Sequence, residues 1–179
     1  MNEPAVSIVG MAGTPVVSKL IRHLDKVEGV KEPVNHVAWK FYWGPLVLLY
    51  ESHLKGGVQI TPWLHVEEAQ ASGRIYRIVE YRMPATAFQV QLLWRECEKR
   101  DKLGYDRLRI LGYYAWIRGS RRTNEDFLKI HRENAMTCNE LLVDTGRLIF
   151  ECMQDLDFSN TPNKVMKFCQ ETIPEARVT

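Results

Sequence analysis

A cysteine, a histidine and a glutamate are the residues of this 179-residue sequence that could together perform nucleophilic chemistry. Cys138 directly follows Thr137, and Glu140 stands three residues after Thr137. This T-x-x-E spacing is that of a capping box, so we predict a helix with Thr137 as its N-cap and Cys138 at its first position. At that position the unpaired amides and the helix dipole favour the negative charge of a thiolate. The alternative is a cysteine that merely begins a helix.

A nucleophilic thiolate needs a base, normally an imidazole that a polar group orients. His36 lies in an apolar, strand-like run, where an imidazole has little reason to be unless it is paired. Gly44-Pro45 predicts a turn, so antiparallel pairing can bring Glu51 of the next strand beside His36. His53 would point to the same side as Glu51 and competes for this role. Taken alone, His36 is more simply a core histidine, and Glu51 an edge-strand carboxylate.

The other histidines and cysteines have weaker claims to chemistry. His131 lies in a polar stretch seven residues before Cys138 and is a weak rival base. The other three cysteines fall within helical patterns, where burial as free thiols is the natural expectation: Cys97, Cys152 and Cys169. The four cysteines form no C-x-x-C pair and no zinc-finger spacing with histidine. We therefore predict neither a metal site nor a cofactor.

The elements that must position these residues give an α+β pattern. Strand patterns cover residues 5–11, 34–43, 46–51, 58–61 and 74–82. Helical patterns cover residues 15–24, 62–69, 86–102, 106–116 and 124–133, and the segment that begins at Cys138. The sequence therefore predicts a small antiparallel meander, roughly residues 34–82, packed against helices. We expect a single domain that spans residues 1–179.

Composition narrows the class of protein. The chain is 45% hydrophobic and 26% charged, which fits a globular domain that buries a proper core. Its net charge of +2 is too small to indicate electrostatic binding to nucleic acid or to an anionic membrane. Because no apolar run approaches the roughly 20 residues of a membrane span, we predict no span. Because the N-terminus lacks the pattern of a signal peptide, we expect a cytoplasmic protein.

Several short runs resemble the circularly permuted papain-like proteins of the NlpC/P60 superfamily, in its YiiX-like branch. The runs are Gly13-Thr14-Pro15-Val16-Val17-Ser18-Lys19-Leu20-Ile21-Arg22, Asn35-His36-Val37-Ala38, Tyr50-Glu51-Ser52, Gly57-Val58, Gly104-Tyr105-Asp106 and Cys138-Asn139-Glu140. They are spread over residues 8–145, and His36 and the helix start at Cys138 are their specific parts. Asn35 and Asn139 stand where the family commonly has Ser, and Ala38 where it commonly has Gly. These departures remove no catalytic group.

The resemblance implies a permuted papain-like fold and a set of roles. Cys138 would be the nucleophile, His36 the base and Glu51 the third polar member, and the Cys138 N–H would help to hold an oxyanion. Attack on an acyl carbonyl would give an acyl-enzyme, followed by hydrolysis or transfer. The implied partners are peptide, peptidoglycan-peptide or other acyl substrates. The lipid acyltransferase branch usually carries N-C-E-H-F, and the run Thr137-Cys138-Asn139-Glu140-Leu141 argues mildly against it.

The sequence therefore supports two alternative functions from different classes. The first is a cysteine hydrolase, most simply a peptidase or amidase, with a lipid-type thiol acyltransferase as a variant. The second is a catalytically silent papain-like module for binding or assembly. Trp39, Trp43 and Trp63 would suit either function by lining a groove around the proposed cleft. The complete set of Cys138, His36 and Glu51 favours the enzyme. The sequence leaves the oligomeric state open.

Overall fold

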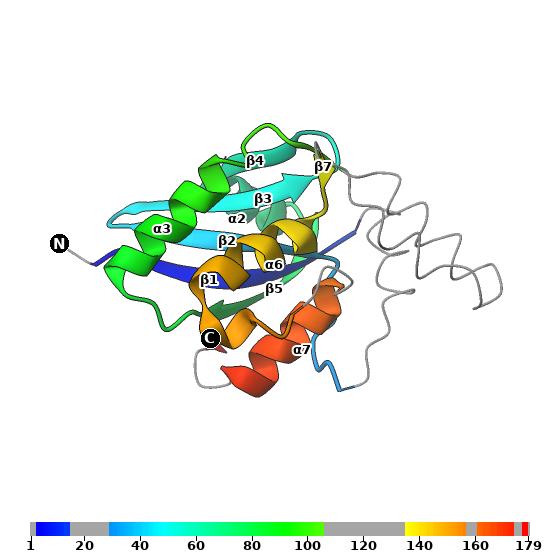
Figure 1. Ribbon diagram of the computed structural model, residues 1–179. Helices are drawn as coiled ribbons and strands as arrows, with labels where there is room; N and C mark the ends of the chain where they lie inside the picture. The colour runs from blue at the N-terminus through cyan, green and yellow to red at the C-terminus, as the bar shows by residue number, and fades with distance from the viewer. Residues whose placement is uncertain (1–2, 15–28, 106–134, 157–160, 174–176, 179) are drawn as a thin grey trace, which may run out of the picture.

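The computed structural model describes residues 3–14, 29–105, 135–156, 161–173 and 177–178, and Figure 1 shows their arrangement. The strands are β1 (Ala5–Gly13), β2 (His36–Trp43), β3 (Leu46–His53), β4 (Gly57–Pro62), β5 (Ile75–Arg82), β6 (Gly104–Tyr105), β7 (Ala135–Met136) and β8 (Arg177–Val178). The helices are α2 (Trp63–Ala71), α3 (Ala87–Glu98), α6 (Cys138–Ile149), the 3₁₀ turn η1 (Glu151–Met153) and α7 (Pro162–Thr172). The helices expected at residues 15–24, 106–116 and 124–133 lie outside the described residues, as does His131.

The described strands form a six-stranded antiparallel sheet in the order β4-β3-β2-β1-β5-β8. The meander predicted for residues 34–82 is correct only from β2 to β4, because β1 inserts between β2 and β5. Its composition explains this central place: Val6, Ile8 and Val9 are all fully buried, so β1 packs apolar side chains against both faces of the sheet. The strands β6 and β7 form a separate parallel pair.

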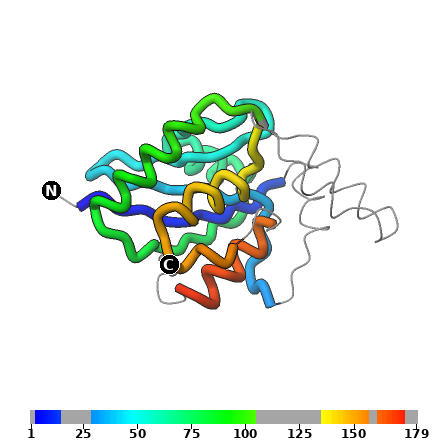
Figure 2. The backbone as a smooth tube through the Cα atoms, in the orientation of Figure 1, coloured from blue at the N-terminus to red at the C-terminus, as the bar shows by residue number. Residues whose placement is uncertain are grey.

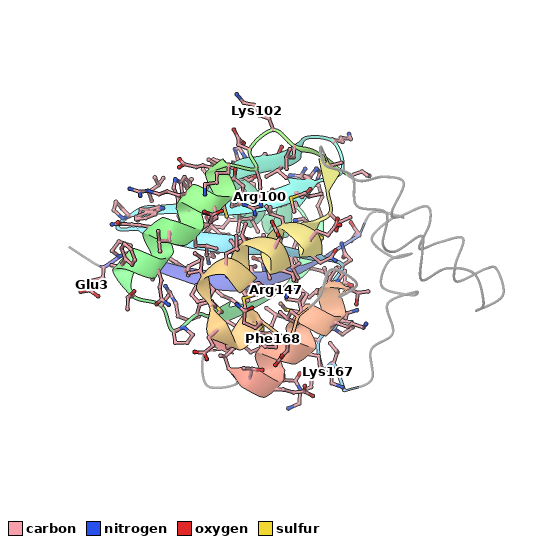
Figure 3. The ribbon with its side chains drawn as sticks, in the orientation of Figure 1. Glu3, Arg100, Lys102, Arg147, Lys167 and Phe168 are labelled. Carbon is pink, nitrogen blue, oxygen red and sulfur yellow. The ribbon has the colours of Figure 1, made fainter. Side chains whose placement is uncertain are left out.

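Helices cover both faces of the sheet. In Figure 1, α3, α6 and α7 lie in front of the sheet and α2 lies behind it. Side chains along β2 point alternately to the two faces of the sheet. Trp39 and Phe41 belong to the core beneath the three front helices, and Ala38 belongs to a smaller core beneath α2. Arg100, labelled in Figure 3, follows α3 and donates through Nε to Asp144 Oδ2 of α6 at 2.6 Å, which ties two front helices together. Within the described part of the chain, none of the helices has the length and apolar character needed to cross a membrane.

Trp39 joins β2 to α6. Its side chain is fully buried, and its Nε1 donates to Thr145 Oγ1 at 2.8 Å. The Thr145 hydroxyl in turn donates to the carbonyl of Leu141 at 2.6 Å, so its proton and a lone pair are both used. Gly146 permits this close packing, because a Cβ there would stand 3.0 Å from the Trp39 ring and 2.5 Å from Met153 Sδ.

The tryptophans do not form the groove that the sequence suggested. Trp39 is enclosed in the core, so that expectation is wrong for it. Trp43 packs against Trp94, with ring centroids 6.0 Å apart, and lies roughly 20 Å along β2 from His36. Trp63 packs on the α2 face of the sheet, where Lys40 Nζ stands 3.5 Å from its ring centroid. Each ring therefore packs against other side chains of the fold.

A buried ion pair crosses the α2 face of the sheet. Lys40 Nζ lies 2.8 Å from Glu80 Oε2, and each side chain is only 8% exposed. The Tyr42 hydroxyl donates to the other oxygen of Glu80. Burial by itself would raise the pKa of Glu80, but the hydrogen bonds from Lys40 and Tyr42 outweigh it and lower that pKa. Glu80 is therefore an ionised carboxylate whose two oxygens are both bonded.

Removing one partner of this pair should cost more than removing both charges. Lys40→Met strands the Glu80 carboxylate in the core and should lower the free energy of unfolding by about 3–5 kcal/mol. Adding Glu80→Gln removes the stranded charge while an amide oxygen still accepts from Tyr42, so the double variant should recover much of the loss. Urea unfolding of the single and double variants measures this coupling. Additive losses would contradict it.

Candidate active site

Cys138 is the first residue of α6, as the sequence predicted. Thr137 is the extended N-cap residue, and the capping box is complete. The Thr137 N–H donates to Glu140 Oε2 at 2.7 Å, and the Glu140 N–H donates to Thr137 Oγ1 at 3.4 Å. The box leaves the thiol of Cys138 in the first turn of the helix, where amides and dipole favour a negative charge.

Contacts with the sheet fix where this helix begins. Ser52 Oγ of β3 donates to the carbonyl of Met136 at 2.5 Å, two residues before Cys138. Met136 belongs to β7, which pairs with β6. Leu103, the residue before β6, accepts a hydrogen bond at its carbonyl from Val58 N of β4 at 2.8 Å. In Figure 2 the yellow segment that leads into α6 accordingly lies beside the cyan ends of β3 and β4. The residues before Cys138 are therefore held by a side-chain bond from β3 and by backbone pairing with β6.

His36 and Glu51 meet where β2 and β3 stop pairing. The β2–β3 register runs from Trp43↔Leu46 to Trp39↔Tyr50. Beyond it, His36 stays paired with β1 and Glu51 with β4, and their side chains join across the gap. His36 Nε2 lies 2.7 Å from Glu51 Oε2, and Thr61 Oγ1 of β4 donates to Glu51 Oε1 at 2.5 Å. Both oxygens of the carboxylate are therefore bonded.

The thiol of Cys138 completes the arrangement. It lies close enough to His36 to raise the pKa of the imidazole through its charge and through hydrogen bonding. Because Nε2 bonds Glu51, Nδ1 is the ring nitrogen that remains for the thiol. The His36 side chain is 17% exposed and Cys138 is 4% exposed, so little water reaches this pair. The structure therefore brings together the three residues that the sequence singled out, over a separation of about 100 residues in the chain.

The electrostatics of the site favour a protonated imidazole. Burial by itself would lower the pKa of His36, but the charge and hydrogen bond of Cys138 and those of Glu51 raise it to about 10. Burial would likewise raise the pKa of Glu51, but His36 and the Thr61 hydroxyl lower it to about 2. Cys138 and Glu51 therefore both favour the positive charge of the His36 imidazole.

His53 does not take the role in which it competed with Glu51. Its ring meets the His36 ring edge-on, with centroids 6.4 Å apart, and its Nδ1 accepts from the Lys55 N–H at 3.5 Å. Loss of hydration lowers the pKa of His53, and the nearby positive charges of His36 and Lys55 add to this effect against the attraction of Glu51. Glu51, rather than His53, is thus the partner of the His36 imidazole.

The other cysteines lie away from this arrangement. Cys97 in α3 and Cys169 in α7 are fully buried, as predicted, and burial raises the pKa of both thiols. Cys152 departs from the helical pattern that was expected to contain it, because α6 ends at Ile149 and Phe150 adopts an extended conformation. Cys152 then lies half-buried in η1.

Two polar residues of the site were missed from the sequence, Ser52 and Thr61. Ser52 is fully buried beside the helix start, and Thr61 lies at the edge of the sheet. Alternation along β3 offered one signal, because it places Ser52 on the same face as the buried Tyr50. A polar residue on a buried face needs a partner. For Thr61 the useful signal is its place on the strand next to β3, which only the register reveals.

The fold class that the sequence predicted is confirmed by comparison with a solved structure. The crystal structure of the metalloprotein YiiX from Escherichia coli O157:H7 (DUF1105) matches the chain with a TM-score of 0.56 at 15% sequence identity. The match covers 93% of this chain and 80% of that chain. A scan against protein-family models and a search of curated proteins found no match. The chain therefore has a YiiX-like α+β fold, with helices packed against an antiparallel sheet.

The neighbouring structure is that of a metalloprotein, which raises the question of whether the described residues of this chain could hold a metal ion. Among those residues, no group of three or more His, Cys, Asp or Glu side chains is arranged to hold a metal ion. The side chains of Cys138, His36 and Glu51 instead bond one another.

The lowered pKa of Glu51 predicts a pH dependence of stability. Its stabilising contribution is fully present above its ordinary value of 4.5 and is lost as the pH falls through about 2. Over this window wild type should lose on the order of 2 kcal/mol more than Glu51→Gln, whose amide does not titrate. Urea unfolding at several pH values measures the difference, with Glu67→Gln on the exposed side of α2 as a control for charge removal. Parallel pH profiles of wild type and Glu51→Gln would contradict the prediction.

Proposed function

We propose that this protein is a cysteine hydrolase, a peptidase or amidase of the circularly permuted papain-like class within the NlpC/P60 superfamily. The observation that carries the proposal is the meeting of three side chains: His36 bonds Glu51 at 2.7 Å, and Cys138, at the start of a capped helix, acts on the His36 imidazole. The YiiX-like fold supports it, because the chain shares that architecture over 93% of its length. The substrates would be peptide, peptidoglycan-peptide or other acyl compounds.

The arrangement suits an acyl-transfer mechanism. The Cys138 thiolate attacks the acyl carbonyl carbon, so the S–C bond forms as the carbonyl π electrons move to oxygen. The Cys138 N–H, at the first position of α6, donates to this oxyanion. As the tetrahedral intermediate collapses, the C–N bond breaks and the imidazolium of His36 gives its Nδ1 proton to the leaving amine. Glu51 holds the ring through Nε2 and stabilises its charge.

Deacylation returns the enzyme to its starting state. The neutral imidazole of His36 now takes a proton from water, and the water oxygen attacks the thioester carbon. The S–C bond then breaks, the carboxylic acid product leaves, and the thiolate and imidazolium are restored. Each step uses only the thiol, the imidazole and the backbone amide, with Glu51 bonded throughout.

The limited exposure of the site favours a second candidate function. Cys138 is only 4% exposed, and a thiol that substrate does not reach would suit a silent binding or assembly module. The two functions differ in one measurable property. An enzyme requires a selectively reactive thiol near neutral pH, whereas a silent module does not.

Thiol-specific labelling decides between them. We expect iodoacetamide and a panel of acyl probes near pH 7 to modify Cys138 first, with each adduct located by mass spectrometry. Cys138→Ser should abolish the adduct with little loss of packing volume, whereas Cys169→Ala should keep the adduct while lowering the unfolding free energy by about 1 kcal/mol or more. Adducts on Cys97, Cys152 or Cys169 in place of Cys138 would refute the assignment. Uniformly slow labelling of all four would favour the silent module.

A further inference from the structure

Glu51 is fixed from the side opposite His36 by a neighbouring strand. Thr61 Oγ1 donates to Glu51 Oε1 at 2.5 Å, while the other carboxylate oxygen faces His36. Gln59, the register partner of Glu51, donates from Nε2 to Thr61 Oγ1 at 3.2 Å. Thr61 and Gln59 both lie on β4, which is the strand at the edge of the sheet. A continuous series of polar side chains thus runs from this edge to the site.

The direction of each bond in the series follows from the chemistry of its members. An ionised carboxylate only accepts hydrogen bonds, so the single hydroxyl proton of Thr61 must point toward Glu51. The hydroxyl oxygen can then accept from the amide of Gln59. The donors therefore run in one direction, from Gln59 to Thr61 to Glu51, and the carboxylate faces His36 with its second oxygen.

We propose that Thr61 is a positioning residue of the site, whose hydroxyl holds Glu51 in the orientation that bonds His36, with Gln59 directing that hydroxyl. Glu51 is only 6% exposed, so little water is available to replace a lost donor. Hydrogen bonds to charged groups are the stronger kind, and bonding both oxygens restricts rotation of the carboxylate. Thr61 touches Glu51 rather than the reacting atoms, so its role in catalysis rests on the proposed function.

Several titratable groups face His36 and would remain when Thr61 is changed. Cys138 approaches from α6, and Glu51 and His53 approach from β3. Lys55 acts on His53. Since these groups are the same in every Thr61 variant, a change in the titration of His36 would report the orientation of Glu51.

Three variants of β4 separate the hydroxyl from the packing of the side chain. Thr61→Val keeps the shape and favours a strand, so folding should be retained. Thr61→Ser keeps the hydroxyl and loses the methyl group. Gln59→Leu removes the donor that directs the hydroxyl. All are made in the full chain, and melting temperatures confirm that each variant folds.

Two measurements then test the proposal. The first is an NMR titration of the His36 ring, and the second is the pH profile of iodoacetamide labelling at Cys138. Thr61→Val should lower the proton affinity of His36 about tenfold, which moves its titration, and the matching step in the labelling profile of Cys138, to lower pH by about one unit. Thr61→Ser should stay within about twofold of wild type, and Gln59→Leu should fall between the two.

The outcomes keep this inference distinct from the proposed function. If Thr61→Val matches wild type in both measurements, the positioning role is overturned while the function stands. If Thr61→Ser behaves like Thr61→Val, the methyl group and not the hydroxyl matters, and the role is again overturned. If wild-type Cys138 shows no preferential labelling, the proposed function fails, and the His36 titration alone then decides whether Thr61 holds the pair.

Discussion

The hydrogen bond from the Trp39 indole to the Thr145 hydroxyl aligns β2, which carries His36, with α6, which carries Cys138. Trp39 lies three residues after His36 on β2, and Thr145 lies seven residues after Cys138 on α6. Three strand residues span about 10 Å and seven helical residues about the same length. His36 and Cys138 are the N-terminal residues of β2 and α6, so each lies about 10 Å before the bonded pair along its own element. The bond therefore places His36 and Cys138 beside each other. A shift of α6 by one helical turn would separate them by about 5 Å.

Burial strengthens the electrostatic interactions of the site, and it also makes any charged group without a hydrogen-bond partner costly. A carboxylate, an imidazole and a thiol with little access to water interact strongly, but each must be bonded to be tolerated there. The fold meets this demand by drawing partners from several elements: Glu51 from β3, Thr61 from β4 and the helix start at Cys138. The Lys40–Glu80 pair shows the same solution on the other face of the sheet. In both places a buried carboxylate has both of its oxygens hydrogen-bonded by side chains of other strands.

Sequence reasoning reached the parts of the site that local spacing determines. The capping box at Thr137 and the hairpin at Gly44-Pro45 are both encoded within a few residues, so the helix start and the meeting of His36 with Glu51 could be predicted. The place of β1 could not, because its partners lie on both sides and its apolar character alone does not choose between them.

The same limit applies to side chains whose surroundings come from distant segments. Trp39 has the character of a groove-lining residue until α6 is placed above it, and only the register of β4 brings Thr61 to Glu51. Residue type and strand alternation showed which face these side chains would occupy. They did not show what would lie opposite. Contacts between segments far apart in the chain therefore account for most of what was missed.

The central position of β1 also bears on the order in which the molecule can assemble. This strand precedes the other described strands in the chain, yet one of its partners, β5, follows more than 60 residues later, and α6 follows more than 120 residues later. Long-range pairings of this kind close large loops and form slowly. The hairpin that carries His36 and Glu51 is local and can form early, whereas Cys138 joins it only when the last third of the chain has docked. During synthesis Cys138 therefore meets His36 only after the hairpin and strands β1 to β5 have been made.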